Sequence, residues 1–317
     1  METISEATFQ GLKYFFRRSR IFIILAALLV TFLPLYDYFA MSVALLLIVT
    51  LGLMHGATDH ILHFNVQTGN SQSLAGFIKR YLLCIAGMSV IWLALPITAF
   101  VLFIVLSCYH FGQTQLQYLK LSERSLRKKA IYFVWGLMVL VIIVFSNYQS
   151  SIALINSIST SFAIQSDILY LPYIPIIAVG LGMLVMLATK KYSSWKAIGF
   201  EIIELFVIYI FSTELDLLSS FGLFFGLWHS LRAIEVQVKK INLVHQFTFK
   251  DFLKSAAPFT IISIVGISLL LAASTLIESN MKLEMLFLIA ISLVTMPHMV
   301  VYESFYNFHD PYKNKKE

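Results

Sequence analysis

Apolar residues occur along this chain in repeated runs of about 16 to 22 positions, and short polar stretches separate the runs. A helix needs about 20 consecutive apolar residues to cross the hydrocarbon layer of a bilayer. The pattern therefore predicts an all-α, polytopic membrane helix bundle of about ten transmembrane helices. The expected spans are 21–37, 39–63, 78–95, 97–118, 129–147, 172–189, 197–213, 217–236, 256–277 and 283–305.

The connections between the runs carry helix breakers and charges. Pro96 and Asp216 each fall between two successive runs, where a helix would end or a charge would need water. Residues 150–170 mix isoleucine and leucine with serine, threonine, asparagine and glutamine, which is too polar for a span. We expect this stretch to be an extracytoplasmic loop or an interfacial helix. Residues 1–317 are expected to form a single integral membrane domain.

The distribution of positive charge predicts the orientation. Only 13% of the residues are charged, against about 25% in an ordinary soluble domain. With the N-terminus inside, all of the 23 lysines and arginines except Lys282 fall on the cytoplasmic side, as the positive-inside rule requires. We therefore expect a multi-pass protein of the cell inner (plasma) membrane with both termini cytoplasmic. No basic stripe with interleaved aromatics indicates a nucleic-acid partner.

Four histidines within the expected spans share one depth. At 1.5 Å per residue from the outer ends of the spans, His55 lies roughly 24 Å in, His110 roughly 20 Å, His229 roughly 18 Å and His298 roughly 22 Å. Ionisable residues inside a membrane are costly and mark functional sites. Four imidazoles in one layer predict a metal or proton-relay site if the helices converge. Imidazole suits iron, copper, zinc or nickel, and no thiolate cluster indicates structural zinc.

Several neighbours of these histidines are candidates for a supporting role. Asp59 lies four residues after His55, on the same helix face, and could accept the second N–H of a metal-bound imidazole. His60 is turned about 140° from that face and is an alternative ligand. Glu201 and Glu204 lie at a similar depth and are further candidates for hydrogen bonds to the ligands. Four glycines beside the motifs predict close helix packing, although any one of these features alone has a purely structural explanation. They are Gly56, Gly112, Gly222 and Gly226.

The motifs around the histidines, in their order along the chain, resemble a known family. They are His55-Gly56-Ala57-Thr58-Asp59, Tyr109-His110-Phe111-Gly112, Trp228-His229-Ser230-Leu231-Arg232 and Pro297-His298-Met299. Over roughly residues 50–300 the chain is similar to the Brp/Blh family of bacterial and archaeal beta-carotene 15,15'-dioxygenases. The resemblance implies a non-haem iron(II) enzyme that uses O2 to split the central double bond of beta-carotene, or a related carotenoid, into two molecules of all-trans-retinal. It implies membrane lipid as the surroundings of the substrate and a retinal-binding rhodopsin as an acceptor of the product.

The resemblance carries iron ligation onto His55, His110 and His229, and it also places His298 at the centre. Aromatic residues near these histidines are candidates for a substrate tunnel along the polyene. They are Tyr109, Phe111, Phe224, Phe225 and Trp228. The chain departs from the family at Ala233, where a second ligand histidine commonly follows the first by four residues. Either His298 or His60 completes the ligand set, or this member binds iron poorly. Depth favours His298.

Three other functions compete with this one. A membrane transporter or proton-coupled carrier could use the intramembrane histidines and Asp59, but inverted repeats and broken mid-membrane helices are not evident in the sequence. A di-iron desaturase would need about eight clustered histidines. A haem-binding membrane protein would need only two ligands at matched depth, and an absorption spectrum would identify it.

Overall fold

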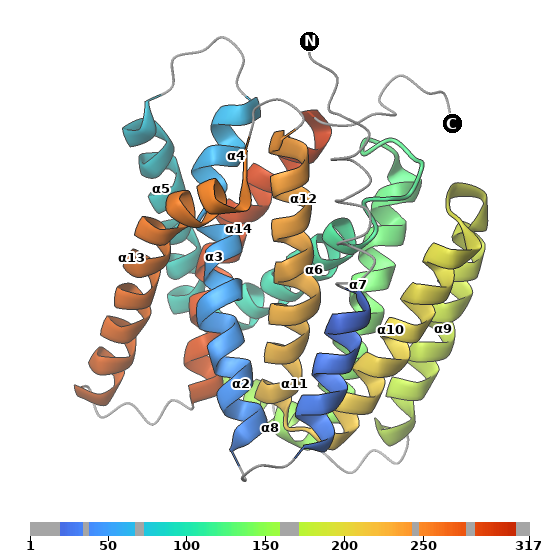
Figure 1. The fold of residues 1–317 in the computed structure, drawn as a ribbon. Helices are drawn as coiled ribbons and strands as arrows, with labels where there is room; N and C mark the ends of the chain where they lie inside the picture. Colours follow the sequence, from blue (N-terminus) through green and yellow to red (C-terminus); the bar gives the residue numbers. More distant parts are fainter. Residues whose placement is uncertain are drawn as a thin grey trace, which may run out of the picture.

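The computed structural model describes residues 20–33, 38–66, 73–158, 171–242, 247–276 and 283–308, and these residues form helices and no strand (Figure 1). The all-α prediction is confirmed. The labelled helices are α2 (Phe39–Leu47), α3 (Leu53–Gly56), α4 (Asp59–Val66), α5 (Leu74–Ala94), α6 (Pro96–Gln115), α7 (Leu126–Ser146), α8 (Tyr148–Ile158), α9 (Ile174–Ala188), α10 (Trp195–Glu214), α11 (Leu217–Leu223), α12 (Leu231–Asn242), α13 (Phe249–Leu276) and α14 (Leu283–Phe308).

Eight helical stretches of the described residues are long and apolar enough to cross a membrane. They are Phe39–Phe64, Leu74–Ala94, Pro96–Gln115, Leu126–Ser146, Leu171–Tyr192, Leu217–Asn242, Phe249–Leu269 and Met285–Phe308. The expected first span is a shorter apolar helix, Arg20–Phe32, and α10 is long enough but carries four charged residues. The count of ten spans remains a prediction.

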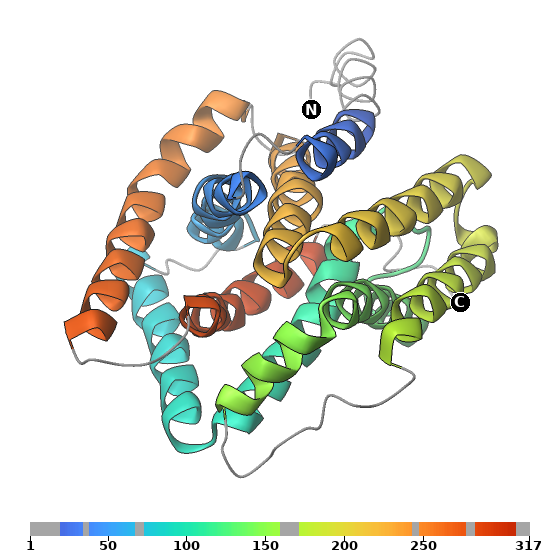
Figure 2. The same ribbon diagram turned by 90° about the horizontal axis from the view of Figure 1, so that it is seen from below.

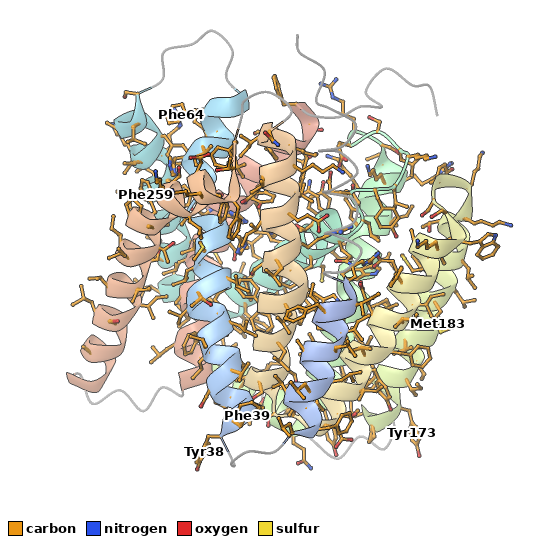
Figure 3. The ribbon with its side chains drawn as sticks, viewed as in Figure 1. Tyr38, Phe39, Phe64, Tyr173, Met183 and Phe259 are labelled. Atoms are coloured by element: carbon orange, nitrogen blue, oxygen red, sulfur yellow. The ribbon has the colours of Figure 1, made fainter. Side chains whose placement is uncertain are left out.

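The two ends of the bundle differ in composition. The α6–α7 and α9–α10 connections, which carry Lys120 and Lys190, lie at its upper end in Figure 1. Tyr38 and Tyr173 lie at the lower end, where they are 73% and 60% exposed (Figure 3). Lysine on one side and tyrosine at the other interface are typical of a membrane bundle. Which end faces the cytoplasm is still a prediction, and both chain termini lie outside the described residues.

Local sequence explains where several helices begin. Pro96 occupies the first turn of α6, and Asp216 caps α11 by accepting hydrogen bonds of 3.0 Å from the amides of Leu218 and Ser219. Both residues stand at the turns expected of them. Part of the polar stretch 150–170 belongs to α8, which lies at the end of the bundle facing the viewer in Figure 2, and residues 159–170 lie outside the described chain.

Two glycines let α6 and α7 pack backbone against backbone. A Cβ atom on Gly112 would lie 1.9 Å from the carbonyl oxygen of Tyr132, and one on Gly136 would lie 1.9 Å from that of Cys108. Gly222 and Gly226 play the same part toward α2, where added Cβ atoms would lie 2.7 and 2.6 Å from side-chain carbons. Inside a membrane, helices associate through close packing, and small residues at such crossings allow it. The contact between α6 and α7 fixes the position of α6, and with it His110.

We expect Gly136→Ala to destabilise the protein by more than the roughly 1–3 kcal/mol typical of overpacking, because the obstacle is backbone and cannot rotate away. Thermal unfolding in detergent, followed by size-exclusion chromatography, measures the loss. Gly180→Ala on α9 is the matched control, since an added Cβ there meets nothing within 4 Å. Equal melting temperatures for the two variants would contradict the packing argument.

Candidate metal centre

Four helical segments each contribute one buried histidine to the middle of the bundle. His55 belongs to α3, His110 to α6 and His298 to α14, while His229 lies on the π-helix η4 (Phe224–Ser230) between α11 and α12. These residues are 4%, 2%, 4% and 3% exposed, respectively. We call these four residues the histidine cluster. The shared depth expected from the sequence corresponds to a real convergence in space.

The rings of the histidine cluster follow one another around a common point. The His55 ring lies 5.0 Å from each of the rings of His229 and His298, and the His110 ring lies 4.8 and 4.9 Å from the same two. Metal–nitrogen bonds of about 2.0–2.1 Å would place neighbouring imidazole centroids about 4.5–5.2 Å apart around one ion. Ligand atoms of His55, His110 and His229 all lie within 4.8 Å of one another. These three residues can therefore hold a metal, and the His298 ring lies beside two of them.

The nitrogen atoms of these rings support the same fit. Among the described residues, both ring nitrogens of His110 and of His229 are buried without a hydrogen-bond partner, as are Nδ1 of His55 and Nε2 of His298. Most buried polar atoms in native proteins have a hydrogen-bond partner, so buried nitrogens without one require an explanation. A metal ion bound by one nitrogen of each ring would account for most of these unpaired nitrogens.

Asp59 orients His298 rather than His55. Nδ1 of His298 lies 2.7 Å from Oδ1 of Asp59, and the hydroxyl of Tyr81 donates to Oδ2 of the same carboxyl group at 3.0 Å. Because a carboxylate can only accept, Nδ1 of His298 carries the proton and Nε2 keeps its lone pair for the cluster. This is the carboxylate–histidine pairing usual beside metal ligands. The sequence left open whether Asp59 serves His55 or a neighbour, and it did not indicate Tyr81.

The helix turn that carries His55 is held by a second group of polar side chains. The amide of Gln237 donates to the carbonyl oxygen of His55 at 2.9 Å, and the hydroxyl of Thr58 reaches the same oxygen at 3.0 Å. Tyr302, which packs on the rings of His110 and His298, is hydrogen-bonded to Gln237. Gln237 and Tyr302 lie on α12 and α14, far from His55 in sequence, so no local motif signals them.

Two π-helical turns adjoin the histidine cluster. The turn η1 (Ile48–Gly52) directly precedes α3, and η4 contains His229 itself. The two meet closely, since a Cβ atom on Gly52 would lie 2.6 Å from the ring of Phe225. Turns of π-helix are rare in proteins, but those that occur are often found at functional sites. Each one rotates the side chains that follow it. Sequence periodicity does not predict them.

The aromatic residues expected to form a tunnel divide into two sets. Phe111 and Phe225 pack directly on the His229 ring at 4.8 and 5.4 Å, and Phe224 contacts Phe111 at 5.1 Å. Trp228 instead packs on Phe211 at 5.7 Å, and the Tyr109 hydroxyl donates to Glu303 at 2.8 Å. The depth of these residues in the membrane could not separate the two sets, because residues that are adjacent in sequence point from different faces of a helix.

Glu201 and Glu204 were expected beside the histidines, but the structure pairs them with other groups. Arg20 binds Glu204 at 2.7 Å and also bonds Glu201, and the Gln115 amide donates to the two carboxylates at 2.9 and 2.7 Å. The expectation failed because residues at the same depth on different helices can point toward different neighbours. Instead, the two carboxylates hold the Arg20–Phe32 helix against α10 and stay paired inside an apolar region.

Arg20→Ala is expected to cost about 3–5 kcal/mol, because two carboxylates with 0% and 2% side-chain exposure would lose their cation. Melting temperature in detergent measures the cost. Adding Glu201→Gln and Glu204→Gln to Arg20→Ala should restore much of it, since neutral amides need no counter-ion. A triple variant no more stable than Arg20→Ala would show that packing of the arginine, and not its charge, matters.

His60 and Ala233 are the other two positions that bear on the ligand set. The ring of His60 packs on Phe259 of α13 at 4.6 Å and is partly exposed. Ala233, at the position where the resemblance implies a ligand, is fully buried in an apolar cluster with Leu62 and Tyr306. Of the two candidates for completing the ligand set, His298 is the one whose ring meets those of His55 and His110.

Comparison with known proteins agrees with this geometry. A family model described as beta-carotene 15,15'-dioxygenase matches residues 46–306. The chain belongs to this family. It is 27% identical over 273 residues to a beta-carotene 15,15'-dioxygenase of an uncultured marine bacterium, 66A03, an alignment that covers 84% of this chain and 94% of that protein. No solved structure matches the chain.

The matched segment of the beta-carotene 15,15'-dioxygenase family contains the whole histidine cluster, Asp59 and Tyr81. It begins after the Arg20–Phe32 helix, so the ion pairs of Arg20 join that helix to the part of the chain that defines the family. The family name indicates an enzyme, and the buried histidines could bind a metal.

Proposed function

We propose that this chain is a non-haem iron carotenoid cleavage dioxygenase that splits the central 15,15' double bond of beta-carotene into two molecules of all-trans-retinal. The observation that carries the proposal is the histidine cluster, in which four rings spaced 4.8 to 5.0 Å apart surround one point with unpaired nitrogens. Membership of the family supplies the reaction and the substrate class. The proposed location is the plasma membrane.

Iron(II) is the metal that fits the proposed reaction. Neutral imidazoles suit several first-row metals, but a reaction with O2 favours one that can change its oxidation state. Iron(II) bound by His55, His110, His229 and His298 would supply activation of O2. Each oxygen atom of O2 ends in one of the two aldehydes, so the reaction needs no external electrons.

The protein's own residues would perform the remaining tasks. Asp59 keeps the proton of His298 on Nδ1 and so leaves Nε2 free for the metal. Phe111 and Phe225 cover His229 with apolar surface, which keeps water from the reacting carbons and offers aromatic contacts to a flat polyene. The surrounding bilayer delivers a substrate that water cannot dissolve.

Expression in bacteria that accumulate beta-carotene tests the proposal. Retinal, measured by chromatography of cell extracts, should form with the intact chain and not with a vector control. Purified protein should contain about one iron per chain, in keeping with one histidine cluster. Folded protein that leaves every carotenoid unchanged in the presence of iron(II) and O2 would overturn the proposal, and a haem absorption band would replace it with the haem-binding alternative.

A further inference from the structure

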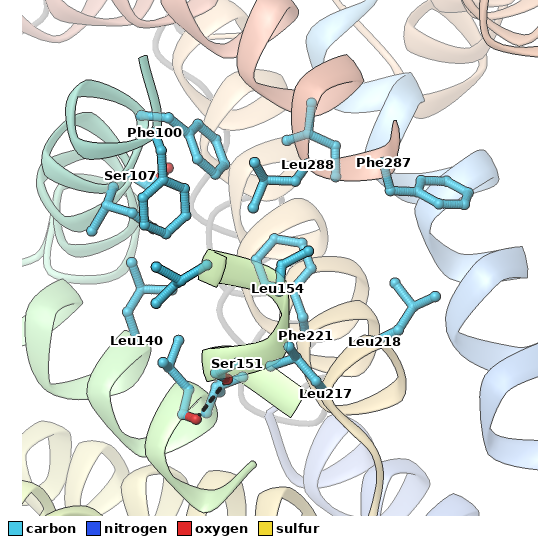
Figure 4. Close-up of a pocket in the computed structure, with 16 residues that line it drawn as sticks. Phe100, Ser107, Leu140, Ser151, Leu154, Leu217, Leu218, Phe221, Phe287 and Leu288 are labelled. Carbon is cyan, nitrogen blue, oxygen red and sulfur yellow. Dashed lines mark hydrogen bonds between the residues drawn. The ribbon is translucent and has the colours of Figure 1, made fainter. Parts of the chain in front are cut away.

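An apolar cavity lies between the histidine cluster and the lower end of the bundle. Its volume is about 100 Å³, and sixteen residues from α6, α7, α8, α11 and α14 line it (Figure 4). Fourteen of the sixteen are apolar, and the other two are serines. Cavities lined in this way favour hydrocarbon over water, as shown by an engineered apolar cavity of about 150 Å³ that stays dry and takes benzene.

Two of the lining residues connect this cavity to the histidine cluster. Phe221 stacks on Phe225 at 5.6 Å, and Phe225 stacks on His229 at 5.4 Å. Ser107 lies one helical turn before His110 on α6. A row of aromatic rings therefore runs from the cavity to the metal-binding residues. None of the aromatic residues that the sequence singled out lines the cavity itself.

The length of this path matches half of a carotenoid. The stacked rings, 5.6 Å apart from Phe221 to Phe225 and 5.4 Å apart from Phe225 to His229, place the Phe221 ring at most about 11 Å from the His229 ring. An extended chain advances about 3.3–3.6 Å per three bonds, so the roughly nine bonds between the central double bond of beta-carotene and its end ring span about 11 Å. With the central bond at the histidines, one end ring reaches the cavity.

We infer that this cavity binds one end ring of the carotenoid and thereby selects the bond that is cleaved. The inference rests on the proposed function and extends it from the metal to the substrate. A ring seated against Phe221 stops the polyene from sliding, and the distance from the cavity to the histidine cluster then sets which carbons face the metal. Filling the cavity should move the substrate along its own axis and present a different bond.

Leu154→Trp is the main test, because Leu154 projects from α8 into the cavity and is remote in sequence from every residue of the cluster (Figure 4). We expect at least a tenfold fall in kcat/KM for central cleavage, and a shift of the remaining product from retinal to pairs of aldehydes of unequal length. Leu288→Phe, a smaller filling of the same cavity from α14, should act in the same direction. Leu93→Trp is the matched control, since Leu93 is 87% exposed on α5.

Two results are decisive, provided that the variant compared elutes as folded protein with wild-type iron content. A wild-type protein that cleaves no carotenoid would overturn the proposed function, and the inference with it. Wild-type cleavage that persists in Leu154→Trp and Leu288→Phe, with unchanged rate and products, would overturn the inference alone and indicate that the cavity holds a lipid chain. Should Leu154→Trp fail to fold, Leu288→Phe decides in the same way.

Discussion

Replacement of His110 by alanine is expected to abolish retinal formation, with a loss of more than about 100-fold. His110 meets the rings of both His229 and His298, so its removal opens the arrangement of the histidine cluster on one side. The expected loss exceeds the 10–100-fold range typical of residues that only support a metal ligand. Chromatography of retinal and metal analysis of the purified protein measure the two consequences, which should fall together.

His60→Ala is the matched control for this experiment. His60 is close to His55 in sequence, but its ring packs on Phe259 of α13 instead of on the other histidines. The variant should therefore keep its iron and at least about half of its activity, as expected for a substitution that removes no ring of the histidine cluster. Normal iron content in His110→Ala, or loss of iron in His60→Ala, would show that the ligand set has been assigned incorrectly.

The sequence predicted the helices well because hydrophobic runs and their breaks are local signals. Pro96 and Asp216 stand at helix starts as expected, and the end of the bundle that carries the α6–α7 and α9–α10 loops is the one rich in lysine. Depth along a helix follows from simple counting, so the convergence of the four histidines was also predictable. The part of the fold determined by one-dimensional spacing was therefore accessible without a structure.

What the sequence could not supply is the direction in which each side chain points. Glu201 lies at a depth close to that of the histidines yet pairs with Arg20, whose partner could not be inferred from any spacing. Each π-helical turn rotates the residues after it, so faces assigned with a regular 3.6-residue period become inaccurate near His55 and His229. Phe221 of α11, just before the second π-helical turn, was not singled out from the sequence, although its spacing of four from Phe225 was a usable signal.

Asp59→Asn is expected to weaken metal binding by about 10- to 100-fold. The asparagine keeps the size of the side chain but removes the charge that holds the proton of His298 on Nδ1, and it can turn its NH2 group toward the ring. His298 would then lose its fixed orientation, while the other three histidines keep theirs. Titration of the purified protein with iron(II) against a competing chelator measures the affinity, and retinal formation should recover at high iron.

Tyr81→Phe tests whether the effect of Asp59 extends one residue further. Its hydroxyl donates to Oδ2 of Asp59 at 3.0 Å, so the phenylalanine leaves the carboxylate in place but less firmly oriented. We expect a smaller loss of affinity in the same direction. The matched control for Asp59→Asn is Asp251→Asn, the same chemical change at the start of α13, which should leave iron binding unaltered.

If Asp59→Asn binds iron as tightly as the wild type, this carboxylate does not hold His298 for a metal. The ion would then be bound by His55, His110 and His229 alone.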